Sequence, residues 1–144
     1  MIKVYLDANI LISLEFDQHP LHQKAIDLLL AINNQEAIFY LSALTLDEYW
    51  HSLMVAFGKK PKELEKLSRS WLALPNFQLI NLELKSEVVK KTIGLINDHH
   101  LHPRDAFHLM YCLENKIDIL ATFDKDLLKI KKIAGLTIMN KSEN

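Results

Sequence analysis

The sequence predicts an α/β fold in which helices cover a mainly parallel central sheet. Short apolar stretches typical of strands alternate with longer stretches in which apolar residues follow a helical spacing. This alternation is typical of parallel sheets whose strands are joined by helices. The chain contains only 3 glycines and 4 prolines, and it shows no flexible linker, low-complexity tract or repeat. We therefore expect a single domain over residues 1–140 and a polar tail over 141–144.

The first expected strand covers residues 2–6, and Asp7 follows it directly. A helix is expected from Asn9. Residues 21–33 form the next expected helix, because apolar side chains recur there every three or four positions and share one face. These side chains are Ala25, Leu28, Leu29 and Ile32.

The second expected strand is the apolar run 37–41, which ends at Ser42. The helix that follows begins near Ser42 or Thr45 and ends by Gly58. It carries Glu48, which we place in its first turn.

The middle of the chain contains a loop over 59–61, a helix that begins at Pro61 or Lys62 and ends at Leu74, and a turn signalled by Pro75 and Asn76. Residues 77–82 alternate like a strand, and a helix follows over 85–99. Pro103 opens another helix, at a position where proline costs nothing. This helix is expected to end near 115. A strand over 117–122, a short basic helix over 125–132 and a final strand over 136–139 complete the chain.

The overall charge does not predict an extended nucleic-acid-binding surface. The chain has 17 basic and 18 acidic residues and a net charge of −1, whereas nucleic-acid-binding domains often carry a basic excess. Any basic contact with RNA is therefore expected to be local. The candidates are the segment 59–69 and the lysines of 125–132, and a solvated helix face is the alternative interpretation of both.

Several features favour a cytoplasmic location. No apolar run approaches the roughly 20 residues that span a bilayer, and the N-terminal sequence lacks the pattern of a secretory signal. The single cysteine, Cys112, cannot form an internal disulfide and is expected in the core.

Four carboxylates stand out, although each has an ordinary structural explanation. Asp7 could form a turn after its strand, and Thr45 with Glu48 fits a capping box. Asp105 lies in a first helical turn, where the helix dipole favours negative charge. Asp124 could cap the last helix.

The positions of the four acids together point to a shared site. The carboxyl ends of parallel strands meet at one edge of such a sheet, where ligands bind. Asp7 and Asp124 follow strands directly, while Glu48 and Asp105 lie in helical turns that begin at the same edge. Carboxylates packed this closely repel one another unless a cation intervenes. The sequence therefore predicts a hard divalent metal at this edge, and such a metal can activate water for phosphodiester hydrolysis.

Four motifs around these acids resemble the PIN-domain family, and within it the VapC-type toxins of toxin–antitoxin pairs. Their order and spacing match over almost the whole chain. The motifs are L-D-A-N at 6–9, S-x-x-T-x-x-E at 42–48, R-D-A at 104–106 and T-F-D-K-D at 122–126.

This resemblance implies a three-layer α/β/α sandwich and an Mg²⁺- or Mn²⁺-dependent endoribonuclease, with Asp7, Glu48, Asp105 and Asp124 as metal-binding and catalytic acids. It also implies an RNA substrate such as tRNA, an antitoxin partner and a homodimer. Secondary candidates are Asp126, Asn9, Thr122 and Arg104, the last because a guanidinium binds phosphate in a bidentate manner.

The sequence departs from the family pattern at two positions. Ala8 stands where a hydroxyl residue is common, and Leu127 stands where an aromatic residue is common. Neither change removes an acid, so the departures bear on the substrate rather than on activity.

Three alternatives remain open at this stage. Glu48 with His51, and Asp105 with His108, have the spacing of a di-iron helical bundle, but the expected strands oppose that fold. An aspartate-nucleophile phosphohydrolase at Asp7 is disfavoured by Asn9, which occupies the second acid position of that class. The third is a PIN-like module that binds RNA or protein without cleaving it. The neighbouring histidines 99, 100 and 102 fit no common zinc spacing and are expected at the surface.

Overall fold

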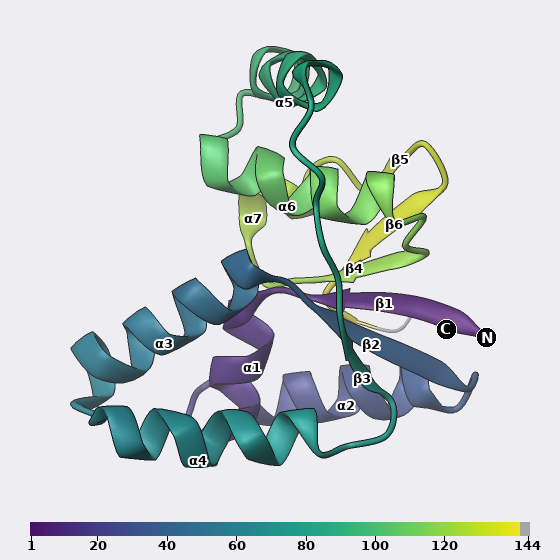
Figure 1. Cartoon of the computed structure of the whole chain (residues 1–144). Helices are drawn as coiled ribbons and strands as arrows, with labels where there is room; N and C mark the ends of the chain where they lie inside the picture. Colours follow the sequence, from purple (N-terminus) through teal and green to yellow (C-terminus); the bar gives the residue numbers. More distant parts are fainter. Residues whose placement is uncertain (142–144) are drawn as a thin grey trace.

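The computed structural model describes residues 1–141, and the expected tail over 141–144 lies outside this range except for its first residue. Within it, strands form a 6-stranded sheet in the order β3-β2-β1-β4-β6-β5 (Figure 1). The strands are β1 (Ile2–Leu6), β2 (Ala37–Leu41), β3 (Phe77–Leu79), β4 (Ile119–Ala121), β5 (Lys132–Ile133) and β6 (Leu136–Met139). All neighbouring pairs are parallel except β5 with β6. The predicted mainly parallel sheet is thus confirmed.

Helices cover both faces of the sheet, as Figure 1 shows. On one side lie α1 (Ala8–Glu15), α2 (His22–Asn33), α3 (Ala43–Phe57) and α4 (Pro61–Leu72). On the other lie α5 (Ser86–His99), α6 (Pro103–Glu114) and the short α7 (Lys125–Leu128). The three-layer α/β/α sandwich is therefore confirmed.

Strand β1 divides the hydrophobic core into two parts, because successive side chains of a strand point to opposite faces. Val4 and Leu6 pack in the cluster beneath α1, α2 and α3, whereas Tyr5 packs in the cluster beneath α6 and α7. All three side chains are fully buried. This arrangement fixes β1 at the centre of the sheet and holds its carboxyl end in one position.

The carboxyl ends of β1 and β4 lie side by side. The backbone N–H of Asp7 donates to the carbonyl of Ala121 at 3.1 Å, and that of Thr122 donates to Met139 at 3.1 Å. The residues that immediately follow three parallel strands therefore meet at one edge of the sheet, as the sequence predicts.

The C-terminal region differs from the sequence prediction. The helix expected over 125–132 ends at Leu128, and a two-residue strand, Lys132–Ile133, pairs in an antiparallel manner with β6. The backbone reverses through residues with positive φ, namely Lys131 (63°), Ala134 (46°) and Gly135 (86°). A helix cannot continue through a left-handed residue, so the lysines beyond α7 do not share a helical face.

Two expected strands are shorter than predicted. The strand expected over 77–82 ends at Leu79, and the strand expected over 117–122 is limited to Ile119–Ala121. Within the part of the chain that the structure describes, no helix is both long and apolar enough to cross a membrane.

Candidate active site

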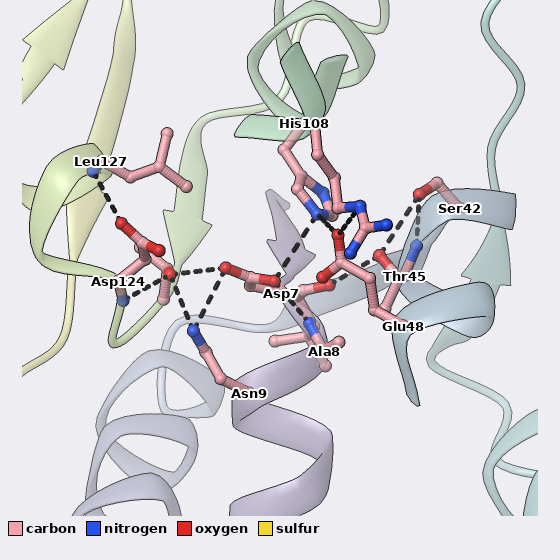
Figure 2. Close-up of polar contacts among 12 residues, drawn as sticks. Asp7, Ala8, Asn9, Ser42, Thr45, Glu48, His108, Asp124 and Leu127 are labelled. Atoms are coloured by element: carbon pink, nitrogen blue, oxygen red, sulfur yellow. Dashed lines mark hydrogen bonds and ion pairs between the residues drawn. The ribbon is translucent and has the colours of Figure 1, made fainter. Parts of the chain in front are cut away.

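Asp7 lies at the centre of the candidate site (Figure 2). Its side chain caps α1 by accepting a hydrogen bond at Oδ1 from the backbone N–H of Ala8, at 2.7 Å. Its Oδ2 accepts a 2.6 Å bond from Thr122 Oγ1 and a 3.3 Å bond from Asn9 Nδ2. The carboxylate is therefore held in one orientation by groups from two segments that are far apart in the sequence.

Burial raises the pKa of Asp7 above its ordinary value, and the charge of Glu48 acts in the same direction. Partly opposing these effects are the charge of His108 and the hydrogen bonds from Thr122 and Ala8. A buried carboxylate whose charge is disfavoured gains most from a nearby cation.

Glu48 approaches Asp7 from α3. Its Oε1 lies 3.0 Å from Nε2 of His108 and 3.5 Å from Nε of Arg104. The expected position in the first turn is wrong, because α3 begins at Ala43 and Glu48 falls in its second turn. The capping box with Thr45 is wrong for the same reason. Ser42 caps the helix by accepting from the backbone N–H of Thr45 at 3.1 Å, which leaves the Glu48 carboxylate free to face the site.

Asp105, Asp124 and Asp126 form a second group, with carboxylate oxygens within 4.8 Å of one another. Asp105 lies in the first turn of α6 as predicted. Asp124 caps α7, since its Oδ1 accepts from the backbone N–H groups of Asp126 at 2.8 Å and Leu127 at 3.2 Å. The cap engages one oxygen of Asp124 only, so its structural role does not prevent the other oxygen from binding a ligand.

Electrostatics link this second group to the first. Burial raises the pKa of Asp105 to about 6, and the negative charges of Asp124, Asp7 and Glu48 contribute to this increase, while His108 opposes it. These charges act on Asp105 because the four predicted acids converge on one region of the sheet edge. Figure 2 shows Asp124 on one side of Asp7, and Glu48 and His108 on the other.

The geometry fits a divalent cation. Donor atoms of Asp7, Glu48 and His108 lie within 4.8 Å of one another, as do those of the group containing Asp105. Carboxylate oxygens are the ligands that Mg²⁺ prefers and Mn²⁺ accepts. The site therefore offers the donor set and the excess negative charge that such a cation requires.

The secondary candidates occupy three kinds of position. Thr122 is buried, and its Oγ1 both donates to Asp7 and accepts from the backbone N–H of Asp124 at 3.0 Å. Asn9 joins the same network through a 3.1 Å bond from the backbone N–H of Phe123 to its Oδ1. Asp126 is exposed and pairs with Lys129 at 3.5 Å, and the Arg104 side chain, which is 61% exposed, reaches Glu48 from the rim.

His108 is the main residue that sequence analysis did not assign to this site. It is buried between the acids, and its Nδ1 lies 2.6 Å from Oη of Tyr5. Burial lowers the pKa of His108, but its hydrogen bond to Glu48 and the charges of Asp7, Glu48 and Asp105 outweigh this effect and raise the pKa. One signal in the sequence could have identified it. His108 lies three residues after Asp105, and residues at this spacing share a helix face.

The rival metal sites do not form. His51 is exposed on α3, and the mixed α/β fold rules out a four-helix di-iron bundle. Histidines 99, 100 and 102 are exposed, as expected. Cys112 is fully buried in the core, also as expected, and burial raises the pKa of its thiol well above the ordinary value.

Solved structures with a similar fold are bacterial toxins and toxin–antitoxin complexes. VapC20 of Mycobacterium tuberculosis, described as a Sarcin-Ricin loop cleaving toxin, has a TM-score of 0.66 and 13% identity, with 90% of this chain and 96% of that chain covered. VapBC2 of Rickettsia felis, solved on a promoter DNA fragment, has a TM-score of 0.64 and 14% identity, with 96% and 98% covered. A toxin–antitoxin complex of Klebsiella pneumoniae has a TM-score of 0.59 and 23% identity, with 93% and 95% covered.

Sequence comparison gives the family. No curated protein matches the chain in sequence. The family model for the PIN domain, however, matches residues 4–133. This range contains the acids Asp7, Glu48, Asp105 and Asp124 and most of the sheet that carries them. The chain therefore belongs to the PIN-domain family.

Proposed function

We propose that this protein is a metal-dependent endoribonuclease that hydrolyses RNA phosphodiester bonds. The observation that carries the proposal is the convergence of Asp7, Glu48, Asp105 and Asp124 at the carboxyl edge of the sheet in a PIN-domain protein. We assign these four acids as the catalytic and metal-binding residues.

The chain's own groups would hold and orient the metal, either Mg²⁺ or Mn²⁺. A bound divalent metal supplies an activated water and neutralises charge on the phosphodiester. Thr122 and Asn9 fix the direction of the Asp7 carboxylate, so this ligand needs little reorganisation when the cation binds. Arg104 lies at the rim, where its exposed guanidinium is available to a phosphate of the RNA strand.

We further propose that the protein is the toxin of a toxin–antitoxin pair. The similar structures from Rickettsia felis and Klebsiella pneumoniae are toxin–antitoxin assemblies, which supports a protein partner. Helices α3 and α4 also expose several large apolar side chains that a partner could cover. These are Trp50, Met54, Val55, Phe57 and Leu72.

The substrate in this proposal is a structured RNA such as tRNA, and the protein acts in the cytoplasm as a homodimer. The structural similarity to VapC20, which is described as a Sarcin-Ricin loop cleaving toxin, supports an RNA substrate of this kind. Sequencing the cleavage products identifies the RNA, and analytical ultracentrifugation determines the oligomeric state.

The direct test is incubation of the purified protein with total RNA and Mg²⁺ or Mn²⁺. We expect discrete fragments that disappear with EDTA and with the variant Asp105→Asn. The matched control is Asp98→Asn, because Asp98 is an exposed acid on α5 that belongs to neither carboxylate group of the site. Cleavage that survives both EDTA and Asp105→Asn rules out the assignment. Absence of cleavage by folded, partner-free, metal-loaded protein on total RNA favours a PIN module that binds without cutting.

A further inference from the structure

The imidazole of His108 faces two of the four acids. Its Nε2 lies 3.0 Å from Oε1 of Glu48 and 3.7 Å from Oδ1 of Asp7. The His108 side chain is 1% exposed, compared with 6% for Asp7 and 18% for Glu48. The ring nitrogen is therefore at the dry inner end of the site, while the more exposed acids lie toward solvent.

The other ring nitrogen is held by a buried set of hydroxyl groups. His108 Nδ1 lies 2.6 Å from Tyr5 Oη, which lies 2.6 Å from Ser42 Oγ. Thr45 Oγ1 lies 3.0 Å from the same Tyr5 oxygen and 3.0 Å from the carbonyl of Leu6. The tyrosine also packs edge-on against the imidazole, with ring centroids 5.6 Å apart. These contacts join β1, α3 and α6, and they fix the plane of the His108 ring.

This arrangement matches the surroundings of a metal-bound histidine. Such a histidine binds the metal through one nitrogen and donates the other N–H to an oxygen, which sets its tautomer. When Nδ1–H of His108 donates to Tyr5, the lone pair of Nε2 points toward the carboxylates of Asp7 and Glu48. Without a metal, Nε2 carries a proton and donates to Glu48 at 3.0 Å. A divalent cation that displaces this proton would find one nitrogen and two carboxylates around it.

The separations between the three donor atoms are also suitable. Metal–ligand bonds of about 2.1 Å place neighbouring ligands of an octahedral ion about 3 Å apart. The 3.0 Å distance from His108 Nε2 to Glu48 Oε1 matches this separation, and the 3.7 Å distance to Asp7 Oδ1 is slightly longer. All three donor atoms lie within 4.8 Å of one another.

We propose that His108 binds the divalent metal through Nε2, together with Asp7 and Glu48, and that this nitrogen makes the site prefer Mn²⁺ over Mg²⁺. An imidazole nitrogen suits first-row transition metals, whereas Mg²⁺ favours an all-oxygen shell. The inference rests on the proposed function, because it concerns the metal of the same site.

The test uses the full-length, metal-free protein loaded with one equivalent of Mn²⁺ and examined by electron spin-echo spectroscopy. We expect nuclear modulation from ¹⁴N in the wild type, replaced by the ¹⁵N pattern when the histidines are ¹⁵N-labelled. This result needs no variant, so it does not depend on whether a substitution folds.

Variants then identify the nitrogen. His108→Gln is expected to lose the ¹⁴N modulation and to bind Mn²⁺ about tenfold more weakly or worse, with a smaller change in Mg²⁺ affinity. The matched control is His51→Gln, because His51 has the same spacing from Glu48 as His108 from Asp105 but is exposed; it should retain the signal. Tyr5→Phe should keep the ¹⁴N modulation but bind Mn²⁺ more weakly, since the His108 ring loses the hydroxyl group that orients it.

The outcomes separate this inference from the proposed function. Tight Mn²⁺ binding without nitrogen modulation in the wild type overturns the role of His108 but leaves the metal-dependent nuclease intact. Modulation that persists in His108→Gln also overturns it. If folded wild-type protein binds neither Mn²⁺ nor Mg²⁺, both the inference and the metal dependence of the proposed function fail.

Discussion

Thr122 Oγ1 donates a 2.6 Å hydrogen bond to Oδ2 of Asp7, across 115 positions of sequence. Both side chains are buried, and they lie just beyond the adjacent ends of β4 and β1. The same hydroxyl accepts from the backbone N–H of Asp124 at 3.0 Å. One threonine thus orients a central acid and fixes the loop that carries a second acid.

Replacing Thr122 with valine should therefore weaken both folding and metal binding. Valine has nearly the same shape, but it leaves the buried Asp7 carboxylate without its shortest hydrogen bond and the Asp124 N–H without an acceptor. We expect a loss of about 1–3 kcal/mol in the free energy of unfolding, measured by urea denaturation, together with weaker Mn²⁺ binding. Thr122→Ser, which keeps the hydroxyl, is the control. Equal effects of valine and serine would contradict the assigned role of the hydrogen bonds.

The stability of the metal-free protein should fall as pH rises. The pKa of Asp105 is about 6 in the folded protein and about 4 in an unfolded chain. A carboxyl whose folded pKa is raised contributes stability that is full below the unfolded pKa and is lost as pH rises through the folded pKa. The relevant window is therefore from about pH 4 to just above pH 6.

Thermal unfolding in EDTA tests this relation through Asp105→Asn, which removes the titrating group. The variant should match the wild type near pH 4 and become the more stable of the two by pH 7. Asp98→Asn, the exposed control on α5, should follow the wild type throughout. A constant difference between Asp105→Asn and the wild type across this range would show that Asp105 does not titrate there.

The fold and the positions of the four acids within it could be predicted because their signals are local. Strand β1 is an apolar run followed by Asp7, and α6 begins at Pro103 with Asp105 in its first turn. Parallel strands then place these positions at one edge by topology alone. Glu48 was assigned to the wrong turn because Ser42 and Thr45 are both good caps, and only the structure shows that Ser42 is used.

The hydrogen bonds that position His108 beside the acids could not be predicted in the same way. The contact between Tyr5 and His108 spans 103 positions, and in sequence Tyr5 is an ordinary apolar residue of a strand. Its hydroxyl becomes important only because β1, α3 and α6 meet at that point. The hairpin of β5 and β6 was missed for a different reason. Lys131 and Ala134 adopt positive φ, which residues with a Cβ rarely do and no local pattern indicated.

Metal binding should stabilise the folded protein, because the cation offsets the electrostatic repulsion between the carboxylates of the site. A ligand present at 100 times its Kd adds about 2.7 kcal/mol to the free energy of unfolding when it binds only the folded state. We expect Mn²⁺ to raise the Tm of the wild type and of Asp98→Asn in this manner at pH 7. Asp7→Asn and Asp105→Asn should show a much smaller increase. An equal increase in all four proteins would indicate that Mn²⁺ binds elsewhere.

Arg104 should contribute to RNA binding rather than to metal binding. Its guanidinium is largely exposed and lies 3.5 Å from Glu48 at the rim of the site, where it can contact a phosphate of the strand being cut. Arg104→Met is expected to lower kcat/KM for RNA about tenfold and to reduce the slope of log affinity against log salt by about 1. Mn²⁺ affinity should change little. Arg104→Lys should recover only part of the loss, because an ammonium group cannot form the bidentate contact. Lys90→Met removes an exposed positive charge from α5 and should alter neither quantity; the same loss in both methionine variants would mean that only the net charge of the protein matters.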